Sequence, residues 1–301
     1  MSVATPDHAR VVMLPDGQRI GLAVFGDPKG LPVLALHGAP ACRMMFEVAA
    51  GEARAKGLKL IAPDRPGYAL SPSEKDHVTL ESRAAQLMSF ADTIGLERFA
   101  LLGVSGGGPY AVAVAAKAPS RITALSLVAP VGPIAECNEA THTIPRAQRM
   151  FFIDMPLHHP HIVRSGAHAS AFMFRLAPHM TAASLAWTLG GADHDILRKP
   201  EVERVMISMT TEALEHGIEG AMADLEIYAR PWNVAYDRIS ARTTLWQGDE
   251  DIVVPPQATY CLARKIPGAR LNRIKGAGHF WIFDHIGEVL ADLGENAAAS
   301  A

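Results

Sequence analysis

Residues 99–109 read Phe-Ala-Leu-Leu-Gly-Val-Ser-Gly-Gly-Gly-Pro, and this stretch decides the fold. Its apolar first half is typical of a strand buried on both faces, and a proline suits the first turn of a helix. Between them, residues 103–107 form the pattern G-x-S-x-G. A serine on a tight strand-to-helix turn needs small neighbours, because the backbone there packs closely. The stretch therefore predicts that Ser105 is a nucleophile at a sheet edge, followed by N–H groups that can stabilise an oxyanion.

The same glycines permit a second interpretation. Residues 106–111 fit G-x-G-x-x-A, the fingerprint of dinucleotide-binding sites. Such a site needs an acidic residue about 20 positions further on, at the end of the next strand. Residues 121–129 contain no acid, and Pro109 would remove one phosphate-binding N–H. We therefore favour the nucleophile and expect no cofactor.

Short apolar runs alternate with helical spacings on both sides of this stretch. The runs predict strands over residues 11–14, 20–25, 32–36, 58–62, 99–104, 122–128, 243–246 and 269–274. Helices are expected over 79–94, with Thr79 as N-cap, and over 109–118, 256–265 and 281–293. The tail, residues 294–301, is expected to fray. This order predicts an α/β fold with a mostly parallel sheet flanked by helices.

Residues 134–232 interrupt this order, because they have helical spacings of Met, Phe, Ala and His without clear β-branched runs. We predict a core formed by residues 1–133 and 233–301, with a helical cap inserted at 134–232. The large apolar residues of the insertion either roof a substrate pocket or fill the core of the cap itself, which is the commoner arrangement. They are Phe151, Phe152, Met155, Phe172, Met173, Phe174, Met180 and Trp187.

Composition narrows the class of protein. The 301 residues are 49% hydrophobic and 20% charged, which excludes a disordered chain, and the net charge of −3 gives no electrostatic footprint for nucleic acid or an anionic membrane. The N-terminus lacks the apolar segment of a signal peptide, and no apolar run predicts a membrane span. Three widely spaced cysteines, Cys42, Cys137 and Cys261, favour a reduced, cytoplasmic protein without disulfides. Nothing in the composition indicates an oligomeric state.

A serine hydroxyl needs a base, usually a histidine that a carboxylate orients, and after a strand-to-helix elbow the chain order is serine, acid, histidine. Residues 249–251, Asp-Glu-Asp, follow one predicted strand, and His279 follows the next in a glycine-rich loop. The 28 positions between Asp251 and His279 accommodate one helix and one strand, so both return to the edge that carries Ser105. His158, His159 and His161 form a separate cluster with no acid at ligand spacing, so no metal is expected.

Together with His37-Gly38-Ala39-Pro40 and the stretch Asp-Arg-Pro-Gly-Tyr-Ala-Leu-Ser at 64–71, these motifs resemble the α/β-hydrolase superfamily, in its serine-nucleophile, capped, esterase-like members. The resemblance covers the whole chain except the predicted cap. It implies Ser105 as nucleophile, His279 as base and Asp251 as acid, with Asp249 and Glu136 as alternatives for the acid. It also implies oxyanion-hole N–H groups from Gly106 and Ala39, because Pro40 has none. Ala69 departs from the family, whose members often have glycine there.

The resemblance implies a serine hydrolase that forms an acyl-enzyme from a small or medium-sized apolar carboxylic ester. Cleavage of a carbon–carbon bond beside a ketone, or of an amide, would use the same triad and stays open. Ser105 argues against dehalogenases and epoxide hydrolases of the superfamily, which have aspartate at the elbow, and HGAPA differs from the HGGPG of proline iminopeptidases. A ligand receptor on a hydrolase scaffold and a structural module are the non-enzymatic alternatives. The expected partner is a small-molecule substrate.

Overall fold

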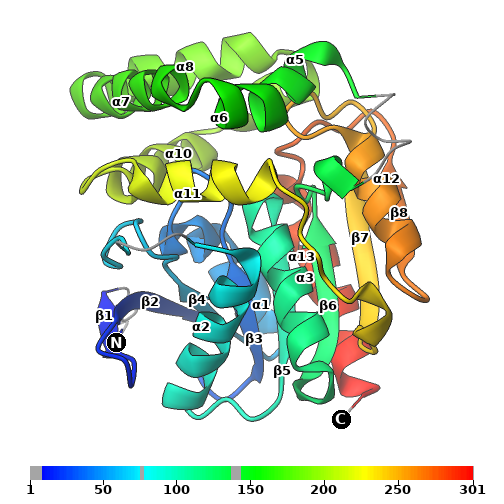
Figure 1. Ribbon diagram of the computed structural model, residues 1–301. Coiled ribbons are helices and arrows are strands. Elements are labelled where there is room, and N and C mark those ends of the chain that lie inside the picture. The colour runs from blue at the N-terminus through cyan, green and yellow to red at the C-terminus, as the bar shows by residue number, and fades with distance from the viewer. Residues whose placement is uncertain (1–8, 75–77, 137–143, 301) are drawn as a thin grey trace.

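A twisted eight-stranded sheet forms the centre of the computed structural model, which describes residues 9–74, 78–136 and 144–300 (Figure 1). The strand order is β1-β2-β4-β3-β5-β6-β7-β8; β1 and β2 pair antiparallel to their neighbours, and all later pairs are parallel. The strands are β1 (Arg10–Met13), β2 (Arg19–Gly26), β3 (Leu31–Leu36), β4 (Leu58–Pro63), β5 (Phe99–Val104), β6 (Ile122–Val128), β7 (Arg242–Gly248) and β8 (Arg270–Ile274). The sequence-based prediction of a mostly parallel α/β sheet is confirmed.

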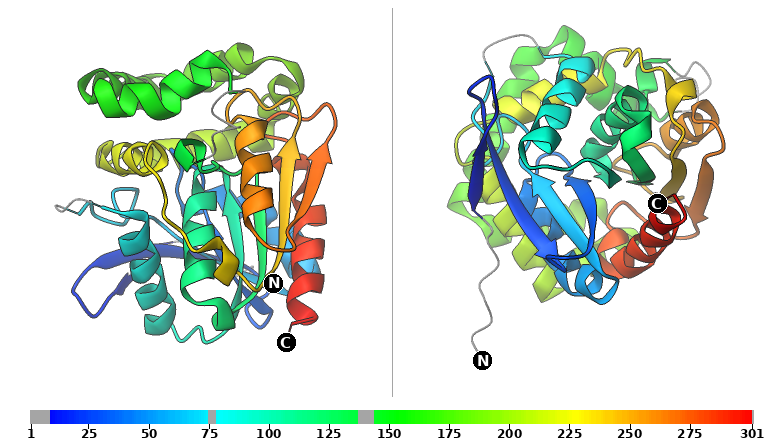
Figure 2. Two further views of the ribbon diagram at one scale, coloured as in Figure 1. Left: turned by 45° about the vertical axis from the view of Figure 1, so that its right-hand side comes forward. Right: turned by 90° about the horizontal axis from the view of Figure 1, so that it is seen from below.

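Helices cover both faces of the sheet, so each central strand is buried on two sides (Figure 2). Alternate residues of β3 enter different cores: Leu34 and Leu36 pack with α2 and α3, whereas Val33 and Ala35 pack with α1 and α13. This alternation follows from the two-residue period of a strand and explains the continuous apolar runs. The helices of these two layers are α1 (Ala50–Ala55), α2 (Leu80–Thr93), α3 (Gly108–Lys117), α12 (Pro256–Lys265) and α13 (Ile282–Ala298).

Local signals in the sequence fix where α2 begins. The Thr79 side chain accepts a hydrogen bond from the Ser82 N–H at 3.1 Å, and the Ser82 hydroxyl in turn receives the Thr79 N–H at 3.1 Å. This reciprocal pair satisfies backbone donors that the first turn of a helix leaves open. The predicted N-cap at Thr79 is therefore confirmed.

A group of helices lies between β6 and β7 in the chain and above the carboxyl ends of the strands (Figure 1). We call them the cap helices. They are η4 (Ile134–Glu136), α5 (Arg146–Arg149), η5 (Met150–Asp154), α6 (Met155–His158), α7 (Pro160–Leu176), α8 (Pro178–Leu189), α9 (Gly191–Leu197), α10 (Pro200–Ala213) and α11 (Glu219–Tyr228). Residues 137–143 of the predicted insertion lie outside the described residues. We propose the boundaries 134 and 232 for the cap as a unit.

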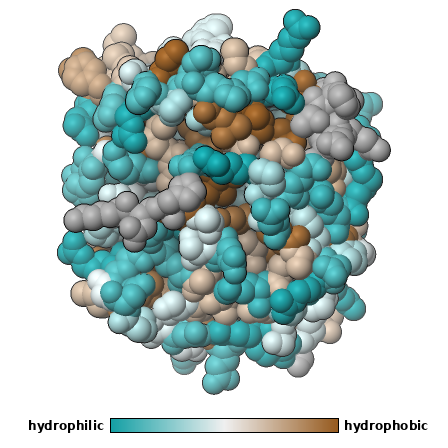
Figure 3. Space-filling view, viewed as in Figure 1, coloured by the Kyte–Doolittle hydropathy of each residue, from teal (hydrophilic) through white to brown (hydrophobic). Residues whose placement is uncertain are grey.

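The large apolar residues of the cap helices divide into two groups. Phe152 and Phe174 are buried, whereas most of the others are exposed, Trp187 by 74%. The exposed ones are Phe151, Phe172, Met173, Met180 and Trp187. For these five residues, the expectation that they fill the core of the cap is therefore wrong. The reason is that α7 and α8 form an outer layer on α10 and α11, so only one stripe of each helix is covered; apolar surface shows along the top of Figure 3.

Two further expectations are wrong. The tail does not fray at residue 294, because α13 continues to Ala298 and the Ala297 side chain is fully buried beneath the sheet. Cys261 forms a disulfide bond, whereas Cys42 is free and buried; Cys137 lies outside the described residues. Spacing along the chain does not reveal which thiols meet in space, so the cysteine count no longer supports a cytoplasmic location.

None of the helices in the described part of the chain has the length and apolar character needed to cross a bilayer.

The packing of the last turn of α13 can be tested with two neighbouring substitutions. Ala297→Asp places an unpaired carboxylate in the core and should lower the free energy of unfolding by at least about 2 kcal/mol. Ala298→Asp is the matched control, because Ala298 is exposed on the same turn, and it should change stability by less than about 0.5 kcal/mol. Urea unfolding measures both; equal values for the two variants would show that the tail is frayed.

Candidate active site

Ser105 lies on the turn between β5 and α3, in the short helix η2 (Ser105–Gly107). Its φ is 51°, a left-handed conformation that is strained for a residue with a Cβ. The turn is held from both sides, because the Ser105 carbonyl accepts N–H groups from Gly108 and, at 3.0 Å, from Val131. A Cβ at Gly107 would overlap the Leu36 carbonyl of β3. The G-x-S-x-G pattern thus reflects a backbone packed against its neighbouring strand.

The structure brings His279 and Asp251 to this serine. The His279 Nε2 atom lies 3.0 Å from Ser105 Oγ, and His279 Nδ1 lies 2.8 Å from Asp251 Oδ2. All three side chains are nearly buried, with exposures of 9% for Ser105, 7% for His279 and 4% for Asp251. Residues from three different strand ends therefore form one continuous chain of hydrogen bonds.

The Asp251 carboxylate is fixed by three further donors. Its Oδ1 atom accepts the N–H groups of Val253 at 2.9 Å and Val254 at 2.8 Å, and its Oδ2 atom accepts the Gln247 side-chain amide at 3.0 Å. The Thr259 hydroxyl donates to the Gln247 carbonyl oxygen at 2.7 Å, which orients that amide. These bonds thus hold the carboxylate aimed at the imidazole.

This geometry assigns the proton on the His279 ring. Ionised Asp251 can only accept, so Nδ1 carries the hydrogen, and Nε2 is left to accept the Ser105 O–H. Burial by itself lowers the pKa of His279, but the charges of Asp251 and Asp193 outweigh burial and hold the pKa above its ordinary value of 6.5. The ring can therefore take a proton from the serine and hold it as an imidazolium.

The two alternative acids lie elsewhere. Asp249 is exposed and accepts the Gly276 N–H at 2.7 Å. Glu136 binds the backbone N–H groups of residues 232 and 233 and the Tyr236 hydroxyl, at the junction that follows α11. Of the three candidate carboxylates, only Asp251 is within hydrogen-bond distance of His279.

Ala39 and Gly106 face the same space beside the nucleophile. A Cβ built on Gly106 would lie 3.2 Å from the Ala39 nitrogen, and one built on Gly38 would lie 3.8 Å from Ser105 Oγ. Gly106 lies in the first turn of η2, where backbone N–H groups have no partner within the helix. The backbone N–H groups of Ala39 and Gly106 thus come from different loops that meet beside Ser105.

A buried arginine holds the loop that carries Ala39. The Arg65 guanidinium donates to the carbonyl oxygens of His37 and of Gly38, the latter at 2.9 Å. The Arg65 N–H donates to His37 Nε2 at 3.1 Å, so the other ring nitrogen carries the proton and donates to the Gly38 carbonyl at 2.8 Å. Burial and the nearby Arg65 lower the pKa of His37 well below its ordinary value, which agrees with a neutral ring. The His37 and Gly38 carbonyls point to Arg65. The Ala39 N–H lies on the opposite side of its peptide from the Gly38 carbonyl, so it points away from Arg65.

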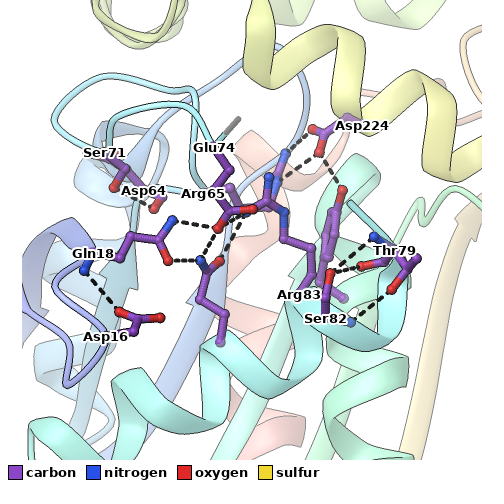
Figure 4. A network of polar contacts seen from close by, with 12 residues as sticks. Asp16, Gln18, Asp64, Arg65, Ser71, Glu74, Thr79, Ser82, Arg83 and Asp224 are labelled. Carbon is purple, nitrogen blue, oxygen red and sulfur yellow. Dashed lines mark hydrogen bonds and ion pairs between the residues drawn. The ribbon is translucent and has the colours of Figure 1, made fainter. Parts of the chain in front are cut away.

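The charge of Arg65 is balanced by Asp224 from cap helix α11, and Figure 4 shows the two side chains pointing toward one another. Their closest atoms are 2.6 Å apart, and both side chains are buried. The hydroxyls of Tyr68 and Tyr110 also donate to the Asp224 carboxylate. Burial and the adjacent Asp224 raise the pKa of both tyrosines well above the ordinary value, so they remain neutral donors. The network is therefore satisfied throughout, as a buried ion pair requires.

Sequence reasoning missed the residues that the cap helices contribute. Tyr228 of α11 donates its hydroxyl to the Gly106 carbonyl at 2.9 Å, and Asp193 of α9 accepts the backbone N–H groups of His279 and Phe280. One signal was present: residues 155–192 contain no acid, and Asp193 comes two positions after the pair Gly190-Gly191. Its partners are backbone groups, so no side-chain pattern could identify them.

The other residues considered in the sequence have structural surroundings. His158, His159 and His161 are exposed at the junction of α6 and α7, and no group of three or more potential ligand side chains converges within the described residues. Burial raises the pKa of the Cys42 thiol, which keeps it neutral. Ala69 adopts φ 44°, which explains why glycine suits this position in the family that the sequence resembles.

A cavity of about 850 Å³ lies between the cap helices and the core. Asp193, Asp251 and Gly278 are among its lining residues, together with Gln148 and Tyr260, but Ser105 is not. The cavity thus reaches the loops that support the site rather than the nucleophile.

Comparison with known proteins finds matches over most of the chain. The model of the alpha/beta hydrolase fold family matches residues 32–286. Over 305 aligned residues the chain is 26% identical to the 2-hydroxymuconate semialdehyde hydrolase of Pseudomonas putida, which covers 99% of this chain and 96% of that protein.

Solved structures share the fold at low identity. An esterase from Exiguobacterium antarcticum has a TM-score of 0.72 at 18% identity, with 96% of this chain and 99% of that one covered. A thermophilic esterase from Thermogutta terrifontis has a TM-score of 0.68 at 24% identity, with 99% of each chain covered. These two likenesses show the fold.

The Arg65–Asp224 pair can be tested by removing one charge. Asp224→Asn leaves the Arg65 charge buried without a counter-ion and should lower the free energy of unfolding by about 3–5 kcal/mol. Glu226→Gln is the matched control on the same helix; its ion pair with Arg230 is exposed, and its loss should cost less than about 1 kcal/mol. Urea unfolding compares the two, and similar losses would contradict the account of the buried network.

Proposed function

Because the chain belongs to the alpha/beta hydrolase fold family, we propose that it is a serine hydrolase in which Ser105 attacks the substrate. In this proposal His279 is the general base and Asp251 is the acid that orients it. The observation that carries the proposal is the unbroken sequence of hydrogen bonds from Asp251 through His279 to Ser105.

Each step of the proposed reaction uses an atom of this arrangement. His279 Nε2 takes the hydroxyl proton while Ser105 Oγ bonds to the carbonyl carbon, and the resulting imidazolium is stabilised by Asp251. The imidazolium then gives its proton to the leaving alcohol as the acyl-enzyme forms. Water, deprotonated by the same nitrogen, attacks the acyl-enzyme, and the proton returns to Ser105 as the acid product leaves.

The oxyanion that forms in both tetrahedral intermediates would be bound by the N–H groups of Ala39 and Gly106. Support comes from the position of both peptides beside Ser105 and from the bonds that orient them. Arg65 holds the Gly38 carbonyl, which shares a peptide with the Ala39 N–H. The N–H groups of Gly108 and Val131 hold the Ser105 carbonyl, which shares a peptide with the Gly106 N–H. Donors that are oriented before the reaction need no reorganisation when the charge develops.

We propose a small or medium-sized apolar carboxylic ester as substrate. The low exposure of Ser105 and His279 supports a small acyl group, because cap helices close over the site. The fold shared with two esterases is compatible with this reaction.

Hydrolysis of a carbon–carbon bond beside a ketone is the second candidate. The observation that favours it is the match over 99% of the chain to a protein named 2-hydroxymuconate semialdehyde hydrolase. The same serine, histidine and oxyanion donors would serve that reaction, so only substrates can separate the two candidates.

The proposed nucleophile is tested by labelling with a fluorophosphonate and reading the intact mass. The wild-type protein should gain one adduct, and Ser105→Ala should gain none and lose about 10⁴-fold or more in kcat.

Short-chain and long-chain nitrophenyl esters and 2-hydroxymuconate semialdehyde are assayed in parallel. Turnover of esters supports the first candidate, and turnover of the semialdehyde alone supports the second. An adduct without any turnover would favour a ligand receptor, and absence of an adduct on the folded protein would refute the serine-hydrolase proposal.

The proposed acid is tested by a pair of substitutions. Asp251→Asn should lower kcat by about 10³–10⁴-fold, because the amide can no longer hold the required tautomer of His279. Asp249→Asn, in the same loop but exposed, should change kcat less than about threefold. The neutral base is lost as pH falls through its raised pKa, so wild-type activity should decline at an acid limb above pH 6.5. Equal losses in the two variants would contradict the assignment of Asp251.

A further inference from the structure

Asp193 joins the cap helices to the loop that carries the proposed base. It lies in the first turn of α9 and is only 3% exposed. Its Oδ2 atom accepts the His279 N–H at 2.8 Å, and its Oδ1 atom accepts the Phe280 N–H at 2.7 Å. One carboxylate thus accepts the backbone N–H groups of two consecutive residues, the first of which is the histidine itself. Asp193 precedes that histidine by 86 positions in the sequence.

The chain is shaped to admit this carboxylate. A Cβ on Gly278 would overlap all three atoms of the Asp193 carboxyl group, so only glycine fits before the histidine. On the other side, Gly190 and Gly191 precede Asp193 with φ values of 60° and 51°, a left-handed region that glycine adopts without strain. Glycines in both segments, the one before Asp193 and the one before His279, therefore permit the carboxylate to approach the backbone closely.

We propose that Asp193 is a positioning residue, through which the cap helices hold His279 in reach of Ser105. The inference rests on the proposed function, because it assigns a role relative to that triad. It goes beyond the proposed function because it gives the cap helices a role in aligning His279 as well as in covering the site.

The Asp193 carboxylate acts on the imidazole in two ways, through its hydrogen bonds to the backbone and through its charge. Hydrogen bonds to an ionised acceptor are roughly twice as strong as neutral ones, and two of them fix the peptide planes on either side of the His279 Cα. A side chain whose backbone is displaced by about 1 Å can lose 10²-fold in rate. The charged groups that face His279 are Asp251 at its Nδ1 atom and Asp193 at its backbone; both hold its pKa up against burial.

A purely structural anchor would behave differently from a positioning residue. If Asp193 only fastens α9 to the core, its loss should lower stability and shift the acid limb through the lost charge, but leave the labelling rate of Ser105 above that limb unchanged. If it positions His279, its loss should also slow the reaction of Ser105 in the folded protein at pH values above the acid limb, where the base is neutral in both proteins.

The test is Asp193→Asn, with Asp195→Asn as matched control. Asp195 lies on the same helix and is exposed, and within the described part of the chain its carboxylate contacts the ring of the adjacent His194. The full chain is labelled with a fluorophosphonate between pH 5 and 9, and the labelling rate is followed by intact mass. Asp193→Asn should label about 10–100-fold more slowly, with the acid limb at lower pH than in the wild type. Asp195→Asn should match the wild type in both.

Each outcome bears on a different claim. If the wild type is labelled at Ser105 and Asp193→Asn has the same rate above the acid limb, the inference about Asp193 is wrong and the proposed function stands. If the folded wild type is not labelled at all, the proposed function fails first.

Asp193→Glu provides a second variant should Asp193→Asn not fold. The longer side chain keeps the charge but cannot reproduce two bonds in a space bounded by Gly278. It should slow labelling while its acid limb stays near that of the wild type, and labelling at the wild-type rate would overturn the inference.

Discussion

The left-handed turn at Ser105 is the constraint on which the rest of the site depends. A residue with a Cβ is held at φ 51° because β5 ends there, α3 begins three residues later and β3 lies directly alongside. The turn places Ser105 at the edge where the parallel strands β5, β7 and β8 all end. Strain at this position is tolerated because the surrounding backbone over-determines it.

Buried charges connect the cap helices to this edge. Asp224 neutralises Arg65 beside the loop that carries Ala39, Asp193 accepts the backbone of the His279 loop, and Glu212 of α10 shares Arg43 with Asp64. Each contact joins a cap helix to a loop that follows a strand of the sheet. Buried ion pairs add little net stability compared with apolar packing, but they allow few alternative arrangements. The cap helices are therefore oriented by polar contacts on their inner side, while α7 and α8 keep apolar residues exposed on the outer side.

The strands, the main helices and the elbow were predictable because their signals are local. Continuous apolar runs mark strands buried on two faces, and Thr79 marks a helix start through bonds within one turn. The positions of Asp251 and His279 followed from chain order and from strand ends meeting at one edge. The contacts of Asp193 were not predictable in this way, because its partners are distant in sequence and are set by how α9 packs on the core. The extent of α13 was missed because alanines give no apolar pattern, although Ala297 is fully buried.

The central claim is that Ser105, the His279 ring and the N–H groups of Ala39 and Gly106 act on one carbonyl carbon. A crystal structure of the protein after reaction with a fluorophosphonate tests this directly, since the phosphonyl group mimics the tetrahedral intermediate. The account predicts phosphorus bonded to Ser105 Oγ, with its oxygen about 2.7–3.1 Å from both nitrogens. Attachment at another residue, or an oxygen directed away from Ala39 and Gly106, would contradict it.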